Sequence, residues 1–163
     1  MSGSMRTTEL LHLIISRLGH DLEVLFTAAK TAHEASIHEE NLPDNKYDTL
    51  ALEASYVAQG QANRVRELRK SIEVYRQLKP QGEGDAPIRL TSLVTLADDA
   101  GTTRTVFLGP VEGGLRIEYQ GEEIVVITPA SPLGRELLGR VVGDSVEIEA
   151  GENRTEYEIV QVG

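Results

Sequence analysis

The sequence contains no cysteine and no tryptophan, and it has only two phenylalanines among its 163 residues. Without cysteine, the chain can form neither disulfide bonds nor thiolate metal sites. No stretch approaches the roughly 18 consecutive apolar residues that a membrane-spanning helix needs. The first ten residues, MSGSMRTTEL, also lack the apolar core of a signal peptide. These absences predict a cytoplasmic protein.

Positive charge is scarce as well, since the formal net charge at neutral pH is −10. Recognition of nucleic-acid phosphates needs a basic surface, so we expect no stable DNA binding by the chain alone. The histidines, at positions 12, 20, 33 and 38, are never three or four residues apart, and this spacing gives no metal-binding pair on a helix. The glycines of LGPVEGG (residues 108–114) come without the lysine of a phosphate-binding loop. Ser131, in ASPLG, lacks the flanking glycines of a nucleophile elbow, so we interpret it as a helix cap and not as a nucleophile.

Apolar residues in the first half recur with the alternating spacing of three and four that is typical of a coiled-coil seam. The first run passes from large side chains to alanine and comprises Leu11, Ile15, Leu18, Leu22, Leu25, Ala29 and Ala32. The second run passes from alanine to large side chains and comprises Ala51, Ala54, Ala58, Gln61, Val65, Leu68, Ile72 and Tyr75. The sizes match only if the two helices are antiparallel. The pattern therefore predicts an antiparallel coiled-coil hairpin over residues 5–79. The alternative is a plain helical hairpin inside a bundle, but the sequence offers no further helices to cover such a hairpin.

Residues 80–87 contain prolines and glycines that stop a helix, and they predict a linker. The remainder, residues 88–163, reads as short strands separated by turns, with one helix over 131–139 for which Ser131 is the N-cap and Pro132 stands in the first turn. The expected strands cover residues 88–97, 103–109, 114–119, 122–128, 144–150 and 154–162. The predicted fold class is α+β, a helical hairpin followed by an antiparallel β domain with one short helix.

An acidic turn separates the two helical runs. Its acids are Glu39, Glu40, Asp44 and Asp48, which we call the acidic tip. Carboxylates suit Mg²⁺, and one or two of them together with substrate phosphates commonly hold that ion. The tip could therefore hold Mg²⁺ only where another body supplies the remaining ligands, so no intrinsic cofactor is expected. In the structural alternative, Asp44 and Asn45 form the turn after Pro43, and Asp48 starts the second helix.

The bases lie on the second helix, away from the tip. They are Arg64, Arg66, Arg69, Lys70, Arg76 and Lys79. A hairpin with an acidic end and a basic shaft would be oriented in a charged channel.

Four motifs of the second half resemble the C-terminal domain of the Gre transcript-cleavage factors of bacterial transcription. They are Ser131-Pro132, Leu137-Leu138-Gly139, Gly143-Asp144 and Tyr157-Glu158-Ile159-Val160. The first half is similar to the family's N-terminal coiled coil with an acidic tip, and Gln59-Gly60 and Arg64 match its second arm. The resemblance thus covers both halves of the chain.

The resemblance implies that residues 88–163 form an FKBP-like domain, which docks on the rim of the RNA polymerase secondary channel. The coiled coil would enter the channel, and the tip acids would help hold a second Mg²⁺ at the polymerase's own catalytic centre, where backtracked RNA is hydrolysed at its 3′ end. The chain would be an accessory factor that touches RNA only indirectly. The self-sufficient seam of the hairpin, apart from the resemblance, predicts a monomer. Asp44 and Asp48 are the first candidates for the metal and cleavage role and Glu39 and Glu40 the next, while the candidate partner-binding residues are Ser131, Pro132, Leu133 and Tyr47.

The tip departs from the family pattern, which continues after its acids with an Asn-Ala-Glu-Tyr-like stretch. This chain keeps Asp44-Asn45 and then reads Lys46-Tyr47-Asp48. Two functions therefore stay open, stimulation of RNA cleavage and occupation of the channel without cleavage. Tyr47 either packs the tip or stacks on a base. Two further alternatives are a peptide-binding or prolyl-isomerase-like module, against which the few aromatic residues speak, and an unrelated helical-hairpin adaptor.

Overall fold

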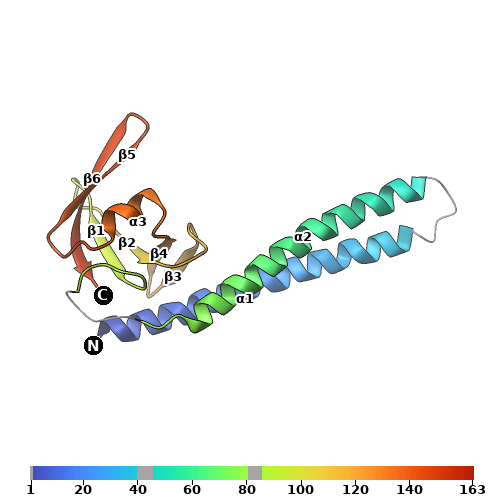
Figure 1. Cartoon of the computed structure of the whole chain (residues 1–163), viewed down its shortest axis with the longest axis horizontal. Helices are drawn as coiled ribbons and strands as arrows, with labels where there is room; N and C mark the ends of the chain where they lie inside the picture. Colours follow the sequence, from blue (N-terminus) through green and yellow to red (C-terminus); the bar gives the residue numbers. More distant parts are fainter. Residues whose placement is uncertain (1, 40–45, 81–85) are drawn as a thin grey trace. The chain divides into compact units, whose positions relative to one another are not determined.

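The structure, a computed structural model, describes residues 2–39, 46–80 and 86–163 (Figure 1). Within the helices, only the backbone is described for residues 2–5, 29, 30, 32–39 and 46–59. Two long helices come first, α1 (Ser2–Glu39) and α2 (Lys46–Gln77), as the two helical runs predicted. Over the described residues, no helix combines the length and the hydropathy of a membrane span.

The chain divides into two compact units, residues 15–73 and residues 1–14 together with 74–163. The predicted division into 5–79, 80–87 and 88–163 stays a prediction, and residues 81–85 of its linker lie outside the described residues.

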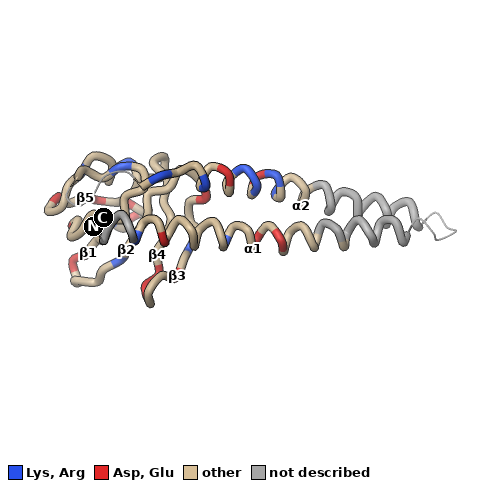
Figure 2. The backbone as a smooth tube through the Cα atoms, turned by 90° about the horizontal axis from the view of Figure 1, so that it is seen from below, with Lys and Arg blue, Asp and Glu red and all other residues tan. Residues whose placement is uncertain are grey.

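In the unit of residues 15–73, α1 and α2 run side by side in opposite directions (Figures 1 and 2). Four predicted seam residues are buried there, Leu18, Val65, Leu68 and Ile72. Ile15, Leu22, Leu25 and Gln61 are half-buried. The predicted alanine positions of the seam lie outside the described side chains. The seam is therefore confirmed for the part of the helix pair whose side chains are described.

The other unit is built around a six-stranded sheet with the strand order β3-β4-β2-β1-β6-β5. Its elements are β1 (Leu93–Ala97), β2 (Thr103–Leu108), β3 (Arg116–Tyr119), β4 (Glu122–Ile127), α3 (Pro132–Leu137), β5 (Ser145–Ala150) and β6 (Asn153–Val162). The predicted strands and the short helix are all present, and the fold class is α+β.

The prediction of a wholly antiparallel sheet was wrong in one pairing. Four pairings between the described strands are antiparallel, but β2 and β4 are parallel, with Thr105 opposite Ile124. The chain passes from β2 beyond the next position to form β3 at the edge, and the β3–β4 hairpin then places β4 in the gap. Local sequence patterns indicate strands and hairpins, but they do not indicate which strand fills such a gap.

The first predicted strand also starts later than expected, because residues 88–92 are not part of the sheet. The backbone amide of Ile88 donates to the carbonyl of Arg140 at 2.8 Å, and Ile88 accepts from Gly139 at 2.8 Å, so this residue is bound to the loop after α3. Thr91 has φ +77°, which interrupts an extended backbone. The strand β1 therefore begins at Leu93.

The sheet is buried on both faces. The helix α3 lies beside one face of the sheet (Figure 1). This face carries the core cluster, to which α3 contributes Leu137 and the partly buried Leu133. The buried members of this cluster are Ile88, Val94, Leu96, Val106, Leu108, Ile127, Leu137, Val146, Ile159 and Val162. Because side chains alternate along a strand, Leu93, Phe107 and Val126 point to the opposite face, and they are buried as well.

Candidate functional site

The acidic tip lies at the connection between the two long helices. Glu39 is the last residue of α1, and Asp48 is in the first turn of α2, which begins at Lys46. Glu40 and Asp44 lie outside the described residues, as do the side chains of Glu39, Asp48 and Tyr47. The predicted metal, cleavage and base-contacting roles of these residues therefore stay predictions.

The basic shaft occupies the second half of α2, where Figure 2 shows Lys and Arg along the helix. Arg64, Arg66, Arg69 and Lys70 are exposed. Arg64 forms an ion pair with Glu67 at 3.1 Å, and Arg66 donates to the side-chain oxygen of Asn63. The exposed guanidinium and ammonium groups provide a surface for phosphate or carboxylate groups of a partner.

The predicted partner-binding residues Ser131, Pro132 and Leu133 begin α3. The Oγ of Ser131 accepts a hydrogen bond from the amide of Gly134 at 3.0 Å and donates to the carbonyl of Thr128 at 2.7 Å. Ser131 is therefore the N-cap, as predicted. Pro132 is exposed, whereas Leu133 is half-buried against the core cluster.

Gly134 explains why this motif contains a glycine. A Cβ atom at this position would overlap the backbone carbonyl oxygen of Thr128 and would lie 2.9 Å from the Oγ of Ser131. The close approach of α3 to the preceding turn thus requires the absence of a side chain.

A hollow of about 380 Å³ lies between α3 and β5. Its lining residues are Pro132, Arg135, Glu136, Glu147, Ile148 and Glu149. Arg154 is within 2.8 Å of Glu147 and 2.6 Å of Glu149, so part of the negative charge is already paired. Among the residues that the structure describes, no group of three or more His, Cys, Asp or Glu side chains is arranged to hold a metal ion.

Four apolar side chains of the β domain are exposed, and we call them the valine patch. They are Leu138, Val141, Val142 and Val160, with exposed fractions between 38% and 42%. The amide of Gly143 donates to the carbonyl of Ile159 at 2.8 Å, and the amide of Ile159 donates to Asp144 at 2.8 Å. These bonds join the loop after α3 to β6, so the patch residues lie on neighbouring segments. Exposed apolar clusters are typical of surfaces that bind other proteins.

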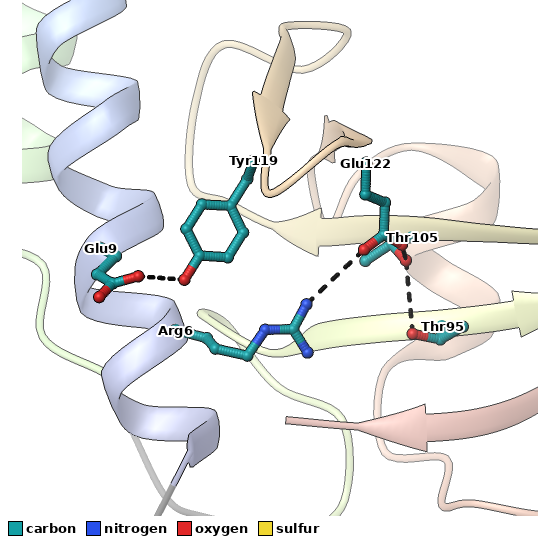
Figure 3. Close-up of polar contacts among 6 residues, drawn as sticks. All are labelled: Arg6, Glu9, Thr95, Thr105, Tyr119 and Glu122. Carbon is teal, nitrogen blue, oxygen red and sulfur yellow. Dashed lines mark hydrogen bonds and ion pairs between the residues drawn. The ribbon is translucent and has the colours of Figure 1, made fainter.

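Sequence reasoning missed a further group of residues, in which the start of α1 contacts the strands β3 and β4. The phenol of Tyr119 on β3 donates a hydrogen bond to the carboxylate of Glu9 on α1 (Figure 3). The guanidinium of Arg6 lies 3.8 Å from the carboxylate of Glu122 and 5.9 Å from the ring centre of Tyr119. Thr105 donates to the same glutamate. The hydrogen bond to Glu9 raises the pKa of the Tyr119 phenol above its usual value, and burial adds to this effect.

The end of α2 is attached separately. The phenol of Tyr75 is almost fully buried and donates to the carbonyl of Val111 at 2.6 Å. Burial raises the pKa of this phenol, and the negative charge of Glu112 adds to the rise. We call the contacts Tyr119–Glu9, Arg6–Glu122 and Tyr75–Val111 the root contacts. One sequence signal for them was available: Thr7, Leu10 and Ile14 form a second helical stripe beside the predicted seam, and all three are buried.

The sequence of this chain is similar to those of known proteins. Residues 84–163 match the family described as "Transcription elongation factor, GreA/GreB, C-term". The chain is also 28% identical, over 122 residues, to transcription elongation factor GreA of Mesorhizobium japonicum. This match covers 75% of the present chain and 73% of the relative.

Solved structures of similar proteins include GreA factor homolog 1 (Gfh1) of Thermus thermophilus, with 24% identity and a TM-score of 0.39. The match covers 91% of this chain and 94% of that one. Gfh1 of Thermus aquaticus is 24% identical with a TM-score of 0.40, over 98% and 95% of the two chains.

Proposed function

Since the chain is a divergent member of the GreA/GreB family of transcription elongation factors, we propose that it binds RNA polymerase and inserts its acidic tip into the polymerase secondary channel. The observation that carries this proposal is the place of the acids. The helix α1 ends at Glu39 and α2 begins at Lys46, so all four acids stand at or beside the connection between two antiparallel helices. A narrow helix pair with carboxylates at its end suits a deep channel.

In the proposed reaction, the tip supplies carboxylate oxygens to a Mg²⁺ ion that the polymerase active site holds. Water attacks the phosphorus of a phosphodiester bond of backtracked RNA, and the bond from phosphorus to the 3′ oxygen of the upstream nucleotide breaks. The retained transcript takes up a proton as its new 3′ hydroxyl, and the short 3′ fragment leaves with a 5′ phosphate. The polymerase is the enzyme, and this chain is an accessory factor without a cofactor of its own. Asp44 and Asp48 are the principal ligands of the proposal, with Glu39 and Glu40 next.

Docking is assigned to the β domain. Pro132 is exposed at the first turn of α3, and the valine patch lies at and beyond the other end of that helix. They offer a partner exposed apolar side chains, and the charged residues Arg135 and Glu136 lie between them. Burial of such side chains contributes about 25 cal/mol for each Å² of apolar surface removed from water.

A second candidate function is occupation of the channel without cleavage. It is favoured by Lys46, which stands between the acids Asp44 and Asp48 and opens α2. A positive charge within one helical turn of Asp48 offsets part of the charge that Mg²⁺ binding needs.

The test uses backtracked elongation complexes with a labelled RNA 3′ end. We expect the protein to accelerate release of the 3′ fragment, and we expect a variant with Asp44→Asn and Asp48→Asn to bind polymerase equally well but to lose the acceleration. Asp99→Asn, an exposed acid in the turn between β1 and β2, is the matched control. If the wild-type protein and the double variant change pausing equally without cleavage, the second candidate holds. Absence of any binding to polymerase contradicts both.

A further inference from the structure

We propose that Glu9, Tyr75 and Tyr119 are positioning residues, which set the axial register of α1 against α2 and thereby the relative placement of the tip acids. This inference rests on the proposed function. The tip takes Glu39 and Glu40 from the end of the first arm, whereas Asp48 belongs to the second arm. Their mutual distances therefore depend on how far one helix is advanced along the other.

The seam near the tip specifies that register poorly. Its predicted positions are all alanine, namely Ala29, Ala32, Ala51, Ala54 and Ala58. Register in a helix pair is set by side chains of different size or by a polar residue that has one suitable partner. A run of identical small residues packs almost equally well after a shift of one turn, which moves a helix by about 5.4 Å. The register must therefore be fixed away from the tip, by large seam residues such as Leu18 and Leu68 and by the ends of the helices beyond them.

The start of α1 and the end of α2 make contacts that fix the register. Tyr119, on β3, fixes the position of α1 because its phenol donates a hydrogen bond to Glu9. One helical turn away, Arg6 forms an ion pair with Glu122 (Figure 3). A shift of α1 by one turn would carry Glu9 away from Tyr119 and break both contacts.

The attachment of α2 is equally specific. The phenol of Tyr75 reaches the carbonyl of Val111 at 2.6 Å, and its oxygen occupies the space that a side chain on Gly109 would need. A Cβ on Gly109 would also lie 3.0 Å from the Cγ1 of Val126, so the phenol oxygen lies beside the sheet face opposite α3. Because Gly109 and Tyr119 belong to the same sheet domain, each helix end is fixed to one common body.

The burial of the helix ends supports the same conclusion. Leu10 and Ile14 are fully buried although neither belongs to the predicted seam. The sheet residues Phe107, Ile124 and Val126 are fully buried on the face that α3 does not cover. Close packing of this kind does not tolerate a shift of several ångströms.

The register is measured directly with spin labels, because the chain has no cysteine to be removed first. One label is placed at His20→Cys on α1 and one at Arg69→Cys on α2, both exposed positions of the unit 15–73. We expect one population of distances in the otherwise wild-type chain. In the variant with Tyr75→Phe and Tyr119→Phe, we expect a second population that corresponds to a displacement of about 5.4 Å, one helical turn.

The functional readout separates positioning from docking. At saturating protein, the double phenylalanine variant should lose at least about fivefold of its effect on backtracked complexes, while its affinity for polymerase changes by less than about twofold, since a positioning role acts after binding. Glu9→Gln keeps an acceptor for Tyr119 and should retain the wild-type distances. Tyr157→Phe, at a tyrosine packed on the α3 face, is the matched control and should change neither readout.

A single unchanged distance population in the double phenylalanine variant overturns the proposal, whatever happens to activity. An unchanged effect on backtracked complexes despite a shifted register overturns it as well. If the wild-type protein has no effect on polymerase at all, the proposed function fails, and the label distances still decide whether the root contacts set the register.

Discussion

Replacing Gly109 by alanine tests the attachment of Tyr75 to the β domain. The added Cβ would overlap the phenol oxygen of Tyr75 and would lie 3.0 Å from Val126 Cγ1 and 3.4 Å from Phe107 Cε2. Both of the latter side chains are fully buried, so neither can move aside freely. The phenol must therefore leave its place, and its hydrogen bond to Val111 is lost.

The expected cost has two parts. Insertion of a methyl group into a packed site costs about 1–3 kcal/mol, and loss of a hydrogen bond costs about 1 kcal/mol. The free energy of unfolding should therefore fall by about 2–4 kcal/mol. For a chain of this size, 1 kcal/mol corresponds to about 2–4 °C, so the melting temperature should fall by about 4–16 °C.

Urea titration followed by circular dichroism measures the change, in the wild-type background and in Tyr75→Phe. Without the phenol oxygen the methyl group has more room, and the cost of Gly109→Ala should be smaller by at least about 1 kcal/mol. Gly60→Ala is the control: this helical glycine has no neighbour within 4 Å of an added Cβ, and the change should stabilise α2 by about 1 kcal/mol. An equal cost of Gly109→Ala in both backgrounds, or a cost below about 0.5 kcal/mol, would refute the reasoning.

The remaining predictions concern α3 and the buried phenol. Ser131→Ala removes the N-cap of α3 and should lower the free energy of unfolding by about 1 kcal/mol in urea titration, whereas an unchanged midpoint would contradict the cap assignment. Gly134→Ala drives a methyl group into the carbonyl of Thr128 and should cost about 3 kcal/mol, seen as a lower melting temperature. The folded-state pKa of Tyr75 lies above the unfolded value of 10.0, so its contribution to stability is complete below pH 10 and is lost as the pH rises further. Above pH 10, the free energy of unfolding from urea titration should therefore fall less steeply with pH in Tyr75→Phe than in the wild type. The two slopes should differ by at most about 1.4 kcal/mol per pH unit, and identical slopes would count against a buried phenol.

Most of the fold could be predicted from the periodicity of apolar residues and from the residues that begin and end helices. The alternating three–four spacing predicted α1 and α2, and the burial of Leu18, Val65 and Leu68 confirms the seam where side chains are described. The motif that begins with Ser131 predicted α3, because a serine cap, a proline at the first position and a later glycine each have a local physical reason. Such signals need no knowledge of the rest of the chain.

Non-local contacts were less accessible. Tyr75 continues the seam spacing, and the pattern does not show that its hydroxyl meets Val111, 36 residues further along the chain. Leu10 and Ile14 lie off the seam because α1 is buried on more than one side at its start. The parallel pairing of β2 with β4 depends on the route of the connection and not on either strand. The acids of the tip were identified from the charge pattern of the sequence alone. This pattern names the residues but does not predict the distances between their carboxylates.

The position of β6 in the sheet has a consequence for biosynthesis. This strand pairs with both β1 and β5, so β1 keeps one open edge until residues 153–162 have left the ribosome. A nascent chain that stops before Asn153 exposes unpaired backbone groups beside the apolar residues of β1, a combination that favours association with other chains. Domain closure therefore follows translation of β6, which is needed to complete the pairing of β1 and β5.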